Sequence, residues 1–386
     1  MTVGFYSPLP PARTGVADYA AALLAELRRH GRVETAPRSC DVALYHLGNN
    51  ALHADIYRRA LERPGVVVLH DAVLHHFLLG QLEETAYVDE FVYNYGEWHR
   101  GLATDLWRGR AASASEARYF DFPMLRRVLE RALAVVVHNA EAGLMAGRAV
   151  WSAGEADGGV GRRPGGLPHF SPRVVEIPHL FQRPEALPSE SAVARYRQRL
   201  GVAPDAFLFG VFGHLRESKR LIPVLETFGE LRRENPRMAL LVAGDCISAE
   251  LERAAAPYLD SPGVVRRPYL PEREFWLAAS AVDACINLRN PAAGETSGIA
   301  TRLMGIGKPV LLTDSPAAAG FPEDACVRIA RGVAERESLR QSLRLLTLAN
   351  GVAAAIGQAG AEHVRQRHHV ELAGTRYWEL LCEYCT

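Results

Sequence analysis

Two positively charged side chains follow an apolar segment near the middle of the chain. Arg216 and Lys219 lie in the run Val211-Phe212-Gly213-His214-Leu215-Arg216-Glu217-Ser218-Lys219. Of the 44 basic residues, only Lys219 and Lys308 are lysines. Arginine binds an oxyanion through a planar fork, whereas lysine acts as a mobile point charge. The pair therefore indicates either a diphosphate site or an ordinary solvated helix start.

A second candidate segment contains Glu295, Thr296, Ser297 and Gly298, and it joins an apolar strand to a helix predicted to begin near Ser297. Backbone N–H groups at a helix start attract anions, so Thr296, Ser297 and Gly298 could cradle a phosphate. The Glu295 carboxylate cannot bind phosphate, but it can accept hydrogen bonds from sugar hydroxyls. Helix capping alone would also explain Thr296 and Ser297.

The first half of the chain offers two further candidates. Gly15 follows a proline-rich loop and begins a helix, where the missing side chain would let a ligand approach the backbone. An ordinary strand-to-helix connection is the alternative for this loop, which lacks the GxGxxG pattern of a dinucleotide fold. His70 ends the apolar strand at residues 66–69 and could contact a substrate or carry a proton, or be structural. His46 ends another strand and could line the same place.

The sequence does not call for a metal or another cofactor. His75 and His76 follow His70 at spacings of five and six, which is a poor ligand set. The chain has no Asp-x-Asp pair. Fixed cations and helix N-termini could neutralise a leaving diphosphate instead.

Short apolar segments alternate with helical segments along most of the chain. Strands are predicted at residues 3–6, 42–45, 66–69, 134–137, 174–178, 207–212, 239–243, 264–265, 284–286 and 310–312. Continuous apolar strands separated by helices are typical of parallel sheets covered on both faces. The alternation occurs twice, so we expect an α/β chain with two Rossmann-like domains facing each other across a cleft.

The same pattern predicts where the domains begin and end. The predicted parts are a first domain at 1–182 with a helical insertion at about 72–132, a linker at 183–204, a second domain at 205–368, and a C-terminal helix at 369–386 that packs back on the first domain. Residues 151–166 lack periodicity and are predicted to form a surface loop.

Composition narrows the class of protein. The chain has 386 residues, 48% hydrophobic and 23% charged, with a formal net charge of zero. The sequence has no long basic run with interleaved aromatics, so nucleic-acid binding is not expected. It also has no apolar run long enough to predict a membrane span. The N-terminus has no secretory pattern, so we expect a cytoplasmic protein, with peripheral membrane attachment left open. The six cysteines form no zinc pattern and are read as thiols.

Taken together, these segments resemble the GT-B glycosyltransferases of family 4, a large group of retaining enzymes. Four segments carry the resemblance in the expected order, namely a glycine loop, a strand-end histidine, a diphosphate-binding Arg/Lys segment and a glutamate-containing motif. They are Ser7–Tyr19, Val68–Asp71, Phe212–Lys219 and Gly294–Val310.

The resemblance implies a hexosyltransferase-type enzyme that moves a sugar from a nucleotide diphosphate donor to an acceptor hydroxyl with retention and without metal. Arg216 and Lys219 would hold the diphosphate, and Glu295 would bind hydroxyls of the donor sugar. Gly15 would touch the donor, and His70 would contact its sugar. The remaining donor-binding positions are His214, Thr296, Ser297 and Gly298. The acceptor would be a small molecule, a glycan or a lipid-linked molecule.

Two positions depart from the family pattern. The family usually has arginine directly after the glycine that here precedes His214. Arg302 stands about where a second glutamate normally binds the donor ribose, one residue short of the usual spacing. Two other readings therefore remain, a nucleotide-sugar epimerase of the same fold and a non-catalytic relative that binds sugar nucleotides.

Overall fold

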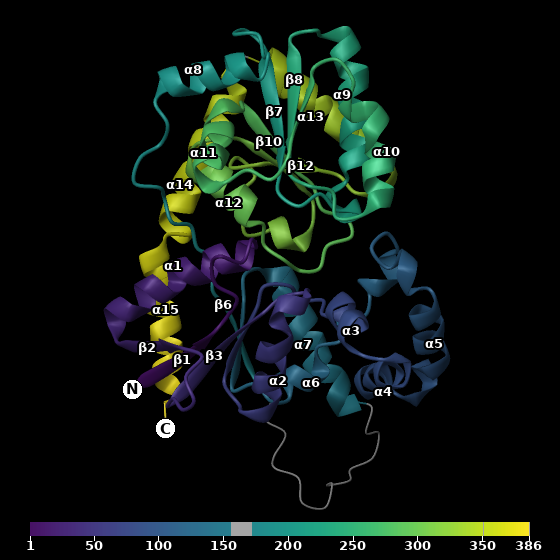
Figure 1. Cartoon of the computed structure of the whole chain (residues 1–386), viewed down its shortest axis with the longest axis vertical. Helices are drawn as coiled ribbons and strands as arrows, with labels where there is room; N and C mark the ends of the chain where they lie inside the picture. The colour runs from purple at the N-terminus through teal and green to yellow at the C-terminus, as the bar shows by residue number, and fades with distance from the viewer. Residues whose placement is uncertain (156–171, 350, 386) are drawn as a thin grey trace, which may run out of the picture. The chain divides into compact units, whose positions relative to one another are not determined.

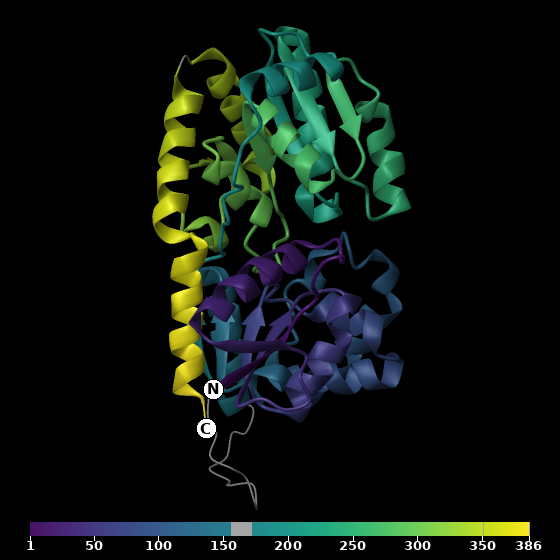
Figure 2. The ribbon, with the colours of Figure 1, turned by 60° about the vertical axis from the view of Figure 1, so that its left-hand side comes forward.

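The computed structural model describes residues 1–155, 172–349 and 351–385, which form two compact units (Figures 1 and 2). The first unit comprises Met1–Leu180, Pro291–Thr296 and Val370–Thr386, and the second comprises Phe181–Asn290 and Ser297–His369. Among the described residues, each unit holds one six-stranded parallel sheet with helices interleaved along the chain. The predicted α/β class is confirmed.

The first sheet has the strand order β2-β1-β3-β4-β5-β6. Its strands are β1 (Thr2–Tyr6), β2 (Arg32–Thr35), β3 (Val42–Leu47), β4 (Val66–Leu69), β5 (Ala134–Val137) and β6 (Arg173–Glu176). In β4, Val67 and Leu69 pack into one core, and Val66 and Val68 pack into another. Both faces of the strand are therefore buried, which explains its continuous apolar sequence.

Helices cover this sheet, and α15 lies beside α1 (Figure 1). The helices of the first unit are α1 (Gly15–His30), α2 (Ala54–Glu62), α3 (His75–Gln81), α4 (Glu84–Tyr95), α5 (Arg100–Arg108), α6 (Arg126–Leu129), α7 (Ala140–Glu155) and α15 (Val370–Glu383), with short 3-10 turns η1 (Ala51–His53), η2 (Glu97–His99), η3 (Arg110–Ala112) and η4 (Ala117–Tyr119). Glycines let α1 and α15 approach closely. A Cβ atom on Gly374 would lie 2.4 Å from Cγ of Glu26, and one on Gly31 would lie 2.3 Å from the Trp378 ring.

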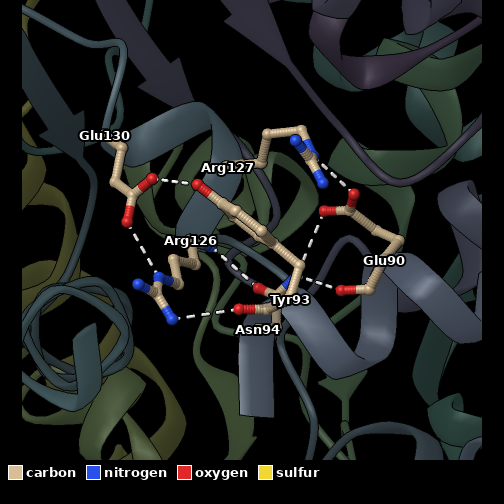
Figure 3. Close-up of polar contacts among 6 residues, drawn as sticks. All are labelled: Glu90, Tyr93, Asn94, Arg126, Arg127 and Glu130. Atoms are coloured by element: carbon tan, nitrogen blue, oxygen red, sulfur yellow. Dashed lines mark hydrogen bonds and ion pairs between the residues drawn. The ribbon is translucent and has the colours of Figure 1, made fainter. Parts of the chain in front are cut away.

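The expected helical insertion consists of α3 to α6, and a polar network joins α4 to α6 (Figure 3). The Arg127 Nε donates to Glu90 at 2.5 Å, and its guanidinium lies 4.0 Å from the centre of the Tyr93 ring. The Asn94 amide donates to Glu90 Oε1 at 3.1 Å, while its oxygen accepts the Arg126 backbone N–H at 2.9 Å. Burial raises the pKa of the Glu90 carboxyl, although Arg127 opposes that shift.

The prediction of a loop at residues 151–166 is wrong for residues 151–155, because α7 continues to Glu155. Alanines at 146, 149 and 153 sustain helix formation there despite the glycines nearby. The rest of that prediction, from residue 156 onward, lies outside the described residues.

The second sheet has the order β12-β11-β10-β7-β8-β9. Its strands are β7 (Phe207–Phe212), β8 (Met238–Ala243), β9 (Val264–Arg267), β10 (Ala284–Asn287), β11 (Val310–Thr313) and β12 (Val327–Ile329). Its helices are α8 (Glu190–Arg199), α9 (Leu221–Glu234), α10 (Ala249–Leu259), α11 (Glu272–Ala281), α12 (Gly298–Gly305), α13 (Glu335–Leu348) and α14 (Val352–Arg367), with 3-10 turns η5 (Glu217–Lys219), η6 (Pro316–Ala318) and η7 (Gly332–Ala334).

Two strands were not predicted, β2 and β12. Both lie at a sheet edge, where one side lacks a partner strand. Each is short and interrupts its apolar residues with charged ones, in the sequences Arg-Val-Glu-Thr and Val-Arg-Ile. Edge strands are often short and charged. The other two edge strands, β6 and β9, keep two adjacent valines and were predicted, whereas β2 and β12 lack such an apolar pair.

Candidate functional site

The strand order of each sheet indicates where a ligand would bind. The chain adds strands in opposite directions from a starting point, which lies between β1 and β3 in the first sheet and between β7 and β10 in the second. In open α/β sheets, ligands bind at the carboxyl ends of the strands beside such a switch point. A ligand is therefore expected at the carboxyl ends of β1 and β3 in the first unit and of β7 and β10 in the second.

Two glycines close the carboxyl edge of the second sheet beside β7. Gly213 has a left-handed φ of 83° and donates its N–H to the Ala243 carbonyl oxygen at 2.9 Å. A Cβ atom on Gly244 would lie 2.1 Å from the Gly213 carbonyl oxygen. A side chain at 213 would be strained by that φ, and one at 244 would clash with the backbone, so the two strand ends depend on glycine.

Lys219 lies at this switch point. Its ammonium donates to the Phe212 carbonyl oxygen at 2.9 Å and would lie 3.2 Å from a Cβ atom on Gly213. The buried Cys285 on β10 feels its charge, which opposes the effect of burial that raises the pKa of the Cys285 thiol to about 12. The ammonium is therefore held at the junction of β7 and β10.

The neighbouring charged residues of this segment differ in their surroundings. Arg216 is exposed and immediately precedes η5, and His214 is half-buried. Arg220 instead donates to the Glu335 carboxylate at 2.8 and 3.0 Å and takes a left-handed conformation before α9. Arg216 and Lys219 remain the cations of this segment that suit a ligand, whereas Arg220 joins two helices.

The start of α12 lies beside the same segment. Ser297 caps the helix, as predicted, by accepting the Ala300 N–H at 3.3 Å, and Gly298 begins it. The next side chain, Ile299, reaches within 3.7 Å of the Cβ position of Gly213. The second unit thus brings the N-terminal turn of α12 close to the segment that carries Gly213 and Lys219, and this arrangement suits the binding of an anion.

The carboxyl edge of the first sheet carries a chain of buried imidazoles. His46 lies in β3, His70 directly follows β4, and His138 directly follows β5. His46 and His70 are 2.9 Å apart between ring nitrogens, and His70 and His138 are 3.3 Å apart. Tyr19 of α1 covers this chain, with its ring centre 4.8 Å from His70 and 5.1 Å from His138.

The anchor of this chain sets its direction. His138 Nδ1 lies 2.9 Å from the Ile177 carbonyl oxygen, so Nδ1 must carry the proton. His138 Nε2 then accepts from His70 Nδ1, and His70 Nε2 accepts from His46 Nδ1. Burial lowers the pKa of His138 to about 4 and those of His46 and His70 well below the ordinary value, with neighbouring imidazoles adding to the effect for these two. A proton added to His70 Nε2 would therefore reverse the bond to His46, which would have to move its own proton from Nδ1 to Nε2.

A buried tyrosine pair fixes the ring that covers the histidines. The hydroxyls of Tyr19 and Tyr377 lie 2.9 Å apart, and both side chains are almost fully buried. Burial raises the pKa of both phenols. The C-terminal helix α15 therefore contributes, through Tyr377, to the arrangement of residues at the first sheet edge.

The segment that carries Glu295 lies against this same edge. The Ala72 N–H, two residues after His70, donates to the Ala293 carbonyl oxygen at 2.7 Å. Glu295 Oε2 accepts the Ala293 N–H at 2.7 Å. The first unit thus brings Glu295 and Thr296 to the strand end that carries His70.

Gly15 begins α1, as predicted, and is exposed. A Cβ atom there would meet no other atom within 4 Å in the described structure, and the residue has no left-handed φ. Neither packing nor backbone conformation therefore requires a glycine at this position.

Arg302 is engaged within the second unit. Its guanidinium lies 4.4 Å from the ring centre of Phe275 and 4.6 Å from that of Trp276, and it pairs with Glu272. These contacts hold Arg302, a residue of α12, against α11. They give the arginine a packing role that the sequence pattern did not reveal.

The structure groups the predicted residues into two clusters. His70, Glu295 and Thr296 lie at the first sheet edge, and Lys219, Ser297 and Gly298 lie at the second. Sequence reasoning missed His138 and Tyr19, and also His179, whose ring centre lies 4.8 Å from that of Tyr19. His138 offered the same signal as His70, because it also directly follows an apolar strand, whereas Tyr19 gave no such signal.

The described part of the chain holds neither a candidate metal site nor a helix that could span a membrane. No group of three or more His, Cys, Asp or Glu side chains there is arranged to hold a metal ion. None of the helices described has the length and apolar character needed to cross a membrane.

Comparison with known proteins gives matches among solved structures. No family model matches the sequence, and no curated protein does. HepE (Alr3699) of Anabaena in complex with UDP and glucose has a TM-score of 0.65 at 15% identity, with 99% of this chain and 100% of that chain covered. Sucrose-phosphate synthase of Thermosynechococcus elongatus has a TM-score of 0.65 at 13% identity, covering 99% and 98%.

A third solved structure agrees with these two. WaaG, a glycosyltransferase involved in lipopolysaccharide biosynthesis, has a TM-score of 0.57 at 13% identity, with 99% of both chains covered. At identities this low the matches show a shared fold, and they extend over nearly the whole length of each protein. The chain therefore has the two-domain fold of the GT-B glycosyltransferases, as its sequence predicted.

Proposed function

We propose that this chain is a retaining glycosyltransferase that moves a sugar from a nucleotide diphosphate sugar to an acceptor hydroxyl. The observation that carries the proposal is the position of Lys219. Its ammonium is anchored on the Phe212 carbonyl oxygen at the switch point of the second sheet, beside the start of α12. A fixed cation beside helix N–H groups suits a diphosphate that gains charge as it leaves.

A uridine diphosphate sugar is the donor to test first. HepE, which shares the fold, has been solved with UDP and with UDP-glucose. At 15% identity this likeness suggests a starting ligand for this chain and does not identify its donor sugar. The acceptor class stays open among small molecules, glycans and lipid-linked molecules, and the proposed location is the cytoplasm.

In the proposed reaction, the bond between the anomeric carbon and the phosphate oxygen breaks, and its electron pair goes to the phosphate. The acceptor oxygen bonds to the anomeric carbon on the same face, which retains the configuration. The acceptor proton passes to the leaving phosphate oxygen, so no separate base is needed. Lys219 and Arg216 would stabilise the diphosphate without a metal, with His214 and the amides of Ser297 and Gly298 around it.

The remaining residues would orient the donor sugar. Glu295 would accept hydrogen bonds from its hydroxyls, and Thr296 would lie beside it. His70 would contact the sugar near the reacting carbon, within the imidazole chain that fixes its ring. Gly15 would allow close approach of the donor to α1, since nothing in the described structure otherwise calls for a glycine there.

One feature favours a second candidate, a relative that binds sugar nucleotides without transferring the sugar. Arg302 replaces the expected ribose-binding glutamate and is committed to contacts with Glu272 and Phe275. Ribose recognition would then depend on other groups, and a donor bound without that contact could be held in a position unsuited to transfer.

Incubation of the purified chain with a panel of nucleotide sugars tests the proposal. A transferase should release the nucleotide slowly without acceptor and faster with a suitable acceptor, and the sugar should keep its anomeric configuration. Sugar inversion in the donor would indicate an epimerase instead. A ligand-induced rise in melting temperature with no turnover would indicate the binding relative.

A further inference from the structure

Asn139 connects the first sheet edge to the segment that carries Glu295. It directly follows His138, is about 5% exposed, and caps α7 by accepting the Ala142 N–H at 2.9 Å. Its amide nitrogen donates to the Gly294 carbonyl oxygen at 2.9 Å and to the Thr296 hydroxyl at 2.8 Å. Residues 291–296 belong to the same unit as Asn139.

These partners allow only one orientation of the Asn139 amide. Its oxygen must face the Ala142 N–H, and its two N–H groups must face the two oxygens. The opposite orientation would place the amide oxygen against the Gly294 carbonyl oxygen and leave a buried donor facing another donor. All polar groups of this buried side chain are therefore used, one for capping and two for the Glu295 segment.

The segment is also fixed from the other side. The Ala72 N–H bonds the Ala293 carbonyl oxygen, and the Ala293 N–H bonds the Glu295 carboxylate. Gly294 has a left-handed φ of 71°, and a Cβ atom there would lie 2.8 Å from Cβ of Ala72 and 3.1 Å from Sδ of Met145. The residues on both sides of Glu295 are thus hydrogen-bonded to the rest of the first unit. The Glu295 carboxylate is itself hydrogen-bonded to the Ala293 N–H.

We propose that Asn139 is a positioning residue that holds the Glu295 carboxylate in its working place. This inference rests on the proposed function, in which Glu295 orients the donor sugar. A shift of about 1 Å in a group that orients a substrate can lower the rate about 100-fold. The competing reading is that Asn139 only caps α7 and that its two other bonds are incidental.

Two substitutions separate these readings. Asn139→Asp keeps an acceptor for the Ala142 N–H but cannot donate to the Gly294 carbonyl oxygen, whereas Asn139→Ala removes both functions. Asn94 offers a matched control, since it is also about 5% exposed and its amide also both donates and accepts hydrogen bonds, in this case between α4 and α6. It lies in the network between α4 and α6 (Figure 3).

We expect Asn139→Asp to lower kcat/KM with a UDP-sugar at least tenfold when the variant and the wild type are both assayed well below their melting temperatures. Hydrogen–deuterium exchange of the peptide covering residues 291–296 should become faster in Asn139→Asp and in Asn139→Ala. The Asn94→Asp control should change neither kcat/KM nor the exchange of residues 291–296. Exchange in the helical insertion around α4 and α6 should become faster in this control.

Unchanged exchange at residues 291–296 in Asn139→Asp, or a kcat/KM within twofold of the wild type, would overturn the inference. Failure of the proposed function would look different, because the wild type itself would then turn over no nucleotide sugar. The exchange measurement would still decide whether Asn139 holds the segment.

Discussion

At the scale of single residues, the two lysines of this chain have different tasks. Lys219 lies at the strand end where a ligand would bind, and its ammonium bonds the Phe212 carbonyl oxygen. Lys308 donates to the Ser280 carbonyl oxygen at 2.8 Å, and burial lowers its pKa. The rarity of lysine therefore marked two positions that hold an ammonium against a backbone carbonyl, one of them outside the candidate site.

The role of Glu295 can be tested by replacing it with glutamine. Glutamine keeps an acceptor oxygen for the Ala293 N–H, so the segment should keep its conformation, but it loses the charge that strengthens bonds to sugar hydroxyls. We expect the Kd for a UDP-sugar to rise about tenfold, or about 1.4 kcal/mol. The Kd for UDP alone should stay within twofold in isothermal titration calorimetry. An equal loss of affinity for both ligands would contradict the assigned role.

Single residues also show how far the sequence could be read. His70 and Ser297 were predictable because each stands at the end of a strand or the start of a helix, and the structure has them there. The bonds of Asn139 to Gly294 and Thr296 were not predictable. They join residues 155 and 157 positions apart, and no local pattern encodes such a pairing.

At the scale of helices and strands, a strand could be predicted where it has at least two adjacent apolar residues, as in the inner strands and the edge strands β6 and β9. The edge strands β2 and β12 lack such a pair and could not be predicted. The helical insertion was predicted as a region, and its internal packing depends on side chains that are distant in sequence. Glu90 and Arg127 illustrate this, because their bond crosses 37 positions.

The network in Figure 3 predicts how the insertion responds to substitution. Glu90→Ala leaves Asn94 and Arg127 without their shared acceptor, and it should destabilise the packing of α4 on α6 by about 2 kcal/mol. The loss is limited because the Arg127 side chain is 38% exposed, so water can solvate its guanidinium. Hydrogen–deuterium exchange in α4 and α6 should accordingly become faster.

Glu84 supplies the control for this experiment, since it lies on the same helix but is exposed. Its replacement by alanine should change exchange in α6 very little. Equal effects of Glu84→Ala and Glu90→Ala would show that the network contributes nothing specific.

At the scale of the whole molecule, the buried imidazoles predict how stability depends on pH. The folded pKa of His138 is about 4, below the ordinary value, so the unfolded chain binds more protons between pH 4 and 6.5. The stabilising contribution is complete above pH 6.5 and is lost as the pH falls toward 4. For this residue alone it amounts to about 3 kcal/mol.

Urea unfolding of the wild type and of His138→Gln checks this dependence. Glutamine cannot take up a proton in this range, so the variant should lose less stability than the wild type between pH 7 and 4.5. Parallel pH profiles for the two proteins would contradict the assignment, because other titrating groups would then account for the whole dependence.

The central claim is that the carboxyl edge of the second sheet neutralises a leaving diphosphate, and Lys219→Ala tests it most directly. Turnover of a UDP-sugar should fall about 100-fold or more, because the lost ammonium acts mainly on charge that develops in the transition state. Lys308→Met serves as the control and should turn over within twofold of the wild type below its melting temperature. Turnover by a folded Lys219→Ala variant within twofold of the wild type would contradict the account.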